Sequence, residues 1–83
     1  MQTYDALLAS FGGLPTISLD QATRFFNYNV DTLAAKIDDG KINLPYFRLD
    51  DSQKAIRLVY LSDLAQLIDS ARAKAANDLK KLR

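Results

Sequence analysis

No cysteine occurs anywhere in the sequence, so this chain has to be stabilised by side-chain packing alone. Disulfide bridges and thiolate metal sites are excluded by the same absence. A chain of 83 residues supports one compact domain, and 48% hydrophobic residues are enough to form its core. We therefore expect a single domain over residues 1–83, without a metal site or a cofactor.

Histidine is also absent, which removes the commonest general base and every catalytic triad that needs an imidazole. No apolar run approaches the ~18 residues that a membrane span requires. The first residues have neither the basic start nor the long apolar stretch of a secretory signal. These observations predict a cytoplasmic protein that is not an enzyme and has no membrane partner.

The formal net charge is only +1, but the charges are unevenly distributed. Residues 1–31 contain one basic and three acidic residues, whereas residues 61–83 contain five basic and three acidic residues. The whole molecule therefore has no strong field that would attract nucleic acid. Any contact with a nucleic acid has to come from a local group of basic residues.

Apolar residues recur at helical spacing in four segments, which predict helices over residues 4–11, 19–26 and 30–39 and from residue 62 to near the end. Polar residues that favour helix starts precede or begin these segments: Thr3, Ser18, either Asn29 or Asp31, and Ser62. Gly12, Gly13 and Gly40 are predicted to end helices, because glycine accepts the left-handed conformation found there.

Between the third and fourth helices, residues 42–49 and 55–60 are rich in β-prone side chains and are separated by a polar segment. This pattern predicts a β-hairpin, in which Pro45 restricts the first strand to a sheet edge. The expected fold is mainly α with a small β-hairpin: a winged helix-turn-helix with a long C-terminal helix.

The polar turn at residues 27–29 joins two predicted helices in the manner of a helix-turn-helix. In that motif the start of the second helix approaches base edges in the major groove. We predict DNA contacts from Asn29, Thr32 and Lys36, and interpret Asp31 as a capping residue. An ordinary helical pair that only packs on a core remains an open alternative.

The tip of the predicted hairpin carries Ser52, Gln53 and Lys54, with Arg48 and Arg57 on its flanks. Arginines at such positions reach phosphates, and tip residues enter the minor groove. The alternative is a solvated lysine in a turn and two arginines on a polar strand face. The two aspartates after residue 49 would repel phosphate unless the arginines pair with them.

Beyond the expected core, the last helix continues its apolar stripe at near-heptad spacing through Ala71, Ala75, Leu79 and Leu82. We predict a homodimer through this stripe, which would join two DNA half-sites. The alternative is that the helix folds back and the stripe belongs to the core.

Two motifs around the tip, Leu44-Pro45-x-x-Arg48 and Leu61-x-Asp63-Leu64, resemble those of excisionase and MerR-type winged helices. The chain more closely resembles the pyocin activator family of the PrtN type. Three segments carry that resemblance: Phe11-Gly12-Gly13-x-Pro15-x-Ile17, Ser52-Gln53-Lys54-Ala55, and Leu61-x-Asp63-Leu64-Ala65-x-x-Ile68-Asp69 followed by Arg72.

The resemblance implies a positive transcription regulator of bacteriocin or prophage genes, which binds double-stranded DNA near a promoter and recruits RNA polymerase. It also implies that residues 52–54 form the wing, with Arg48 and Arg57 on phosphate. Two other functions remain open. One is an excisionase-like architectural factor that bends DNA. The other is a phage protein-interaction module that inhibits a host factor, which the near-neutral charge would suit.

Overall fold

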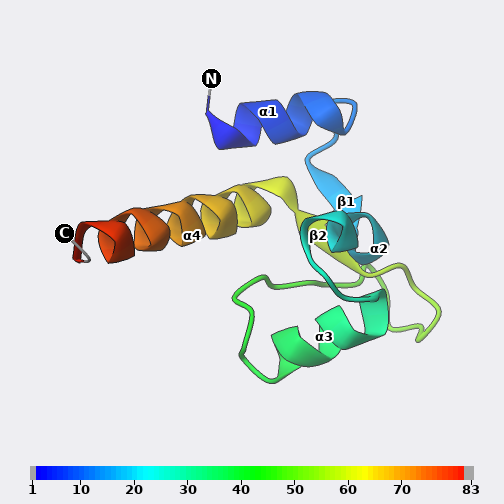
Figure 1. Cartoon of the computed structure of the whole chain (residues 1–83). Coiled ribbons are helices and arrows are strands. Elements are labelled where there is room, and N and C mark those ends of the chain that lie inside the picture. The colour runs from blue at the N-terminus through cyan, green and yellow to red at the C-terminus, as the bar shows by residue number, and fades with distance from the viewer. Residues whose placement is uncertain (1, 82–83) are drawn as a thin grey trace.

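Helices dominate residues 2–81, the part of the chain that the computed structural model describes (Figure 1). The elements follow in the order α1 (Thr3–Ser10), β1 (Thr16–Ser18), α2 (Leu19–Ala22), the 3₁₀ helix η1 (Thr23–Phe25), α3 (Val30–Asp38), β2 (Leu58–Tyr60) and α4 (Leu61–Lys81). The predicted mainly helical fold with a long C-terminal helix is therefore confirmed.

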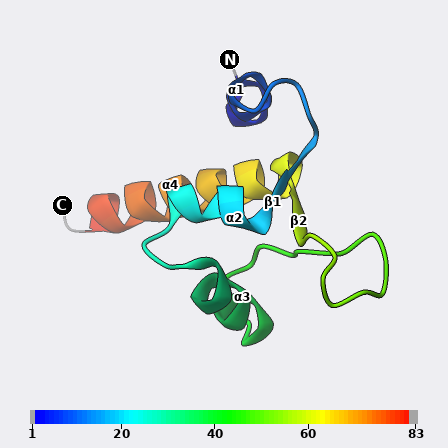
Figure 2. The same cartoon turned by 90° about the vertical axis from the view of Figure 1, so that its right-hand side faces the viewer.

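The long helix α4 lies in the middle of the arrangement. Helix α1 lies on one side of it, whereas α3 and the loop before β2 lie on the other side (Figures 1 and 2). The hydroxyl of Thr3 donates to Asp69 Oδ1 at 2.6 Å and ties the start of α1 to α4. Every residue of α4 from position 69 to 81 is exposed, so the second half of this helix extends beyond the core.

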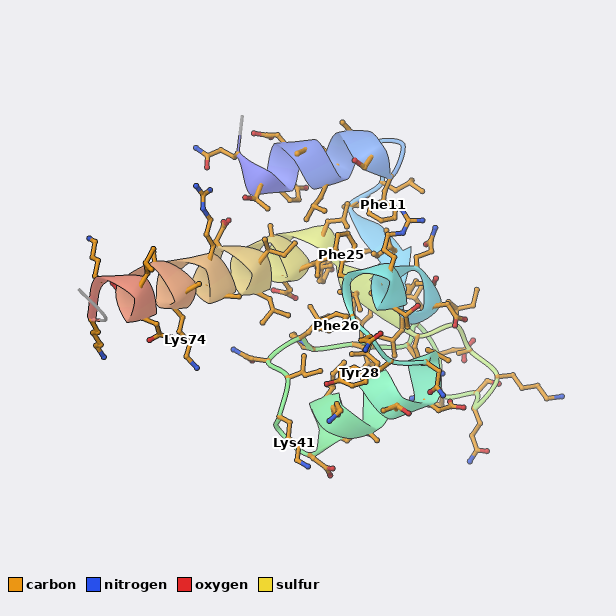
Figure 3. The ribbon with its side chains drawn as sticks, in the orientation of Figure 1. Phe11, Phe25, Phe26, Tyr28, Lys41 and Lys74 are labelled. Atoms are coloured by element: carbon orange, nitrogen blue, oxygen red, sulfur yellow. The ribbon has the colours of Figure 1, made fainter. Side chains whose placement is uncertain are left out.

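One apolar cluster joins the elements, and each helix and strand except η1 contributes to it. Its buried members are Leu7, Ile17, Leu19, Ala22, Leu33, Ala34, Leu44, Val59, Leu61, Leu64 and Ala65. Phe11 packs against this cluster, and its ring centroid lies 6.4 Å from that of Phe25, which connects the end of α1 to η1 (Figure 3). Because the chain has no disulfide, burial of these side chains is the main source of its stability.

Two of the predicted helix caps are confirmed, at the starts of α2 and α3. The hydroxyl of Ser18 accepts from the Gln21 amide at 3.1 Å, while Gln21 Oε1 accepts from the Ser18 amide at 3.0 Å. Asn29 Oδ1 accepts from the amide of Thr32 at 2.8 Å. Asn29 is therefore the cap of α3, and the carboxylate of Asp31 is not used for capping.

The caps predicted at Thr3 and Ser62 are wrong. Helix α1 begins at Thr3 itself, and α4 begins at Leu61 directly after β2, which places Ser62 inside the first turn. The predicted glycine stops are present: Gly12, Gly13 and Gly40 have φ angles of 71°, 82° and 76°. The second predicted helix is α-helical only to Ala22 and continues as 3₁₀.

The predicted hairpin between residues 42–49 and 55–60 is wrong in its strand partner. Strand β2 pairs in antiparallel fashion with β1, which lies about forty residues earlier in the chain. Residues 42–49 contact β2 through one bridge, in which Phe47 and Leu58 exchange backbone hydrogen bonds of 2.9 and 2.8 Å. In that register the residue opposite Tyr60 is Pro45, which has no amide hydrogen to donate. The ladder therefore cannot extend in that direction.

Candidate nucleic-acid interface

The helix pair α2–η1 and α3 presents the start of α3 to solvent. Leu33 and Ala34 are buried and hold α3 on the core, whereas Asn29 and Thr32 are exposed at its beginning. Because the side chain of Asn29 accepts the cap hydrogen bond through its oxygen, its amide nitrogen remains available as a donor. The start of α3 thus offers a hydroxyl and an amide to an external partner.

A concavity of about 470 Å³ lies between the starts of α2 and α3 and the loop that leads to β2. Figures 1 and 2 show this loop and α3 together on the side of the molecule away from α1. The lining side chains come from both parts of the predicted interface: Ser18, Leu19, Asp20, Val30, Asp31, Arg48, Gln53, Lys54, Ala55, Ile56 and Arg57. We call this feature the α3–loop concavity. It brings four of the predicted DNA-contacting residues, Arg48, Gln53, Lys54 and Arg57, to the start of α3.

Arg57 forms an ion pair across the α3–loop concavity. Its Nη2 atom lies 3.6 Å from Oδ1 of Asp31, in the first turn of α3. The Arg57 side chain is only 24% exposed, whereas that of Asp31 is 89% exposed. Arg57 therefore links the base of the loop to the recognition-helix candidate and is not a free surface cation.

Lys36 and Arg48, also predicted as DNA contacts, both lie over aromatic rings. The Lys36 ammonium is 4.8 Å from the centroid of the Tyr28 ring, which Figure 3 shows beside α3. The Arg48 guanidinium carbon is 6.0 Å from the Tyr46 ring centroid. Such cation–π contacts hold a charge in place without neutralising it. Lys36 is partly buried and lies outside the lining of the α3–loop concavity, whereas Arg48 is exposed.

Side chain–backbone hydrogen bonds shape the tip of the loop. The Ser52 amide donates to Asp50 Oδ1 at 2.8 Å, and the Lys54 amide donates to the Ser52 hydroxyl at 3.1 Å. Asp50 therefore orders the backbone of the loop. It forms no ion pair with an arginine among the described residues, whereas the sequence predicted that phosphate could bind nearby only if an arginine paired with this aspartate. Ser52 is used in the same way, which leaves Gln53 and Lys54 as the exposed side chains of the tip that face the concavity.

One polar contact near the site was missed from the sequence. The hydroxyl of Tyr46 donates to Asp38 Oδ1 at 3.0 Å and joins the loop to the end of α3. Burial, and then the hydrogen bond to the Asp38 carboxylate, raise the pKa of Tyr46 above its ordinary value. The two residues are eight positions apart and belong to different segments, so no helical or strand periodicity in the sequence indicates that they meet.

A family model described as pyocin activator protein PrtN matches residues 3–75. The chain belongs to the pyocin activator family. The match covers every element through the middle of α4, including both sides of the α3–loop concavity. No curated protein and no solved structure matches the chain.

Membership of the pyocin activator family places the chain among regulatory proteins and indicates a role in activating transcription. No helix within residues 2–81 combines the length and the hydropathy that crossing a membrane demands.

The predicted dimer contacts Ala71, Ala75 and Leu79 are exposed on α4, and Leu79 is 56% exposed. Leu82, the fourth of them, lies outside the described residues.

Proposed function

We propose that this protein is a sequence-specific DNA-binding transcription regulator that activates bacteriocin or prophage genes. The single domain of residues 1–83 would act as a winged helix-turn-helix, with α3 as the recognition helix and residues 48–57 as the wing. The observation that carries the proposal is the α3–loop concavity, because it sets basic loop residues beside the exposed start of α3. The family match supports the regulatory role.

In the proposed complex, Asn29 and Thr32 face base edges in the major groove, since both are exposed at the start of α3, the end that a recognition helix directs at the bases. Arg48 and Lys54 contact phosphates on either side, and Gln53 reaches the neighbouring minor groove. Lys36, held over the Tyr28 ring, contacts a phosphate farther along the groove. The protein would work in the cytoplasm and recruit RNA polymerase to the promoter.

Binding to a fragment that contains its own upstream promoter region tests this proposal. We expect the logarithm of the affinity to fall linearly with the logarithm of the salt concentration, with a slope of about −0.9 for each phosphate contact. With the phosphate contacts of Arg48, Lys54 and Lys36, the slope would be about −3 for each protein molecule bound. Affinity that does not depend on salt, or no affinity for any duplex, would contradict the proposal. Strong bending of the fragment without an effect on transcription would instead support an excisionase-like role.

We further propose that two copies join through the exposed half of α4. Ala71, Ala75 and Leu79 follow one another at intervals of four residues, so they share one helix face that lies outside the core cluster. In sedimentation experiments at tens of micromolar, well above a micromolar dissociation constant, we expect a dimer. The Leu79→Asp variant should shift the population to monomers, because a carboxylate would be buried between the helices. A monomeric wild-type protein would refute this arrangement.

A further inference from the structure

We propose that Asp31 determines part of the DNA sequence preference by accepting a hydrogen bond from the exocyclic amino group of a cytosine. This inference rests on the proposed function, because it places the first turn of α3 in the major groove. It assigns a role in DNA reading to an acidic residue, although acids are usually unfavourable beside the phosphate backbone.

The carboxylate of Asp31 is free to meet an external donor. Asn29 supplies the cap of α3, so the Asp31 carboxylate accepts no capping hydrogen bond. Its side chain is 89% exposed and lines the α3–loop concavity next to the residues proposed to hold the duplex. Within residues 2–81 its one charged partner is Arg57, which approaches Oδ1 and leaves Oδ2 without an ion pair.

Arg57 lies beside this carboxylate and partly compensates its charge. The arginine is mostly buried and comes from the base of β2, which is fixed by its pairing with β1. A carboxylate that is held on one side by a cation is less repelled by phosphates than an isolated one. The Asp31 side chain stays 89% exposed in this pair, so its second oxygen is open to a donor on a base edge.

Hydrogen-bond chemistry selects cytosine among the four bases. An ionised carboxylate has only acceptors, so it requires a donor on the base edge. In the major groove, cytosine offers the N4 amino group, while guanine and thymine offer only acceptors and a methyl group. Adenine has an amino group, but its N7 acceptor lies beside it and repels a carboxylate. Asp31 therefore favours a C·G pair opposite the first turn of α3.

The test is a comparison of base preferences for the wild-type protein and the Asp31→Asn variant. Each protein selects its preferred duplexes from random DNA, and single-base variants of the selected site are then measured by competition. We expect the preference for cytosine at one position to be about tenfold weaker in Asp31→Asn, which is the effect of losing one good base contact. The variant should prefer adenine at that position, because an amide both donates and accepts hydrogen bonds. Its affinity for random duplex should rise, since one negative charge is removed.

Asp20→Asn is the matched control, because it removes one exposed carboxylate from the same concavity at the start of α2. If Asp31 acted only through its charge, both variants would raise the affinity for all duplexes equally and leave every base preference unchanged. That result would overturn the inference while the proposed function stands. Failure of the wild-type protein to select any sequence would overturn both. Circular dichroism confirms that the two variants remain folded.

Discussion

Replacing Leu33 by alanine is expected to reduce the free energy of unfolding by about 2–5 kcal/mol. Leu33 is fully buried, with 0% of its surface exposed, and it holds α3 on the core cluster. Its truncation removes apolar packing and leaves a cavity that the surrounding side chains fill only in part. A domain of 83 residues has a total stability of about 4–12 kcal/mol at ~0.05–0.15 kcal/mol per residue. The substitution would therefore remove a large fraction of the stability.

Urea denaturation of the variant measures this effect, and the Leu49→Ala variant is its control. Leu49 undergoes the same chemical change, but it is 82% exposed in the loop. We expect its substitution to alter the free energy of unfolding by no more than about 0.5 kcal/mol. Equal losses in the two variants would show that α3 is not anchored through Leu33.

Elements whose signals are local were predicted well from the sequence. The start of α3 follows from Asn29, whose side chain bonds to the amide three residues ahead, and its end follows from Gly40. Both effects depend on neighbouring residues only. The same holds for the apolar stripe that buries Leu33 and Ala34, since helical spacing alone places them on one face.

The sheet was predicted less well because its pairing is not local. Pro15 directly precedes β1 and Pro45 lies within residues 42–49, so proline content does not distinguish the two candidate partners of β2. β propensity alone does not decide which strands pair either. Proximity in the chain favoured residues 42–49 as the partner of β2. The structure instead pairs β2 with β1, and Pro45 limits the nearer segment to the single bridge at Phe47.

For the candidate site, residue types and charges were visible in the sequence, but their pairing was not. Arg57 was expected to reach a phosphate, whereas in the structure it faces Asp31 from the end of the loop before β2. Asp50 was expected to need an arginine, whereas it accepts from a backbone amide two residues away. Side-chain partners of this kind depend on where the loop lies relative to α3, which only the tertiary structure defines.

The combined substitution of Lys36, Lys54 and Arg57 by alanine is expected to weaken binding to specific DNA by about 3 kcal/mol, or roughly a hundredfold. Lys36 and Lys54 would each cease to make a charge-assisted hydrogen bond to phosphate. Loss of Arg57 would also leave the Asp31 carboxylate without its compensating cation, so that it repels the duplex. The salt slope should become less steep by about one unit for each phosphate that the variant no longer binds.

A control triple variant with Lys41, Lys74 and Lys80 replaced by alanine removes the same charge from other parts of the surface. Lys41 follows the far end of α3 and Lys74 lies on α4, both away from the α3–loop concavity (Figure 3). If the concavity docks the duplex, titration of labelled promoter DNA will give a much larger loss for the first triple variant than for the control. Equal losses would mean that the three residues act only through net charge. An unchanged affinity in the first variant would remove this surface as the DNA-binding site, because a duplex docked along α3 and the loop would lose Lys36 and Lys54 and would face an Asp31 carboxylate without its cation.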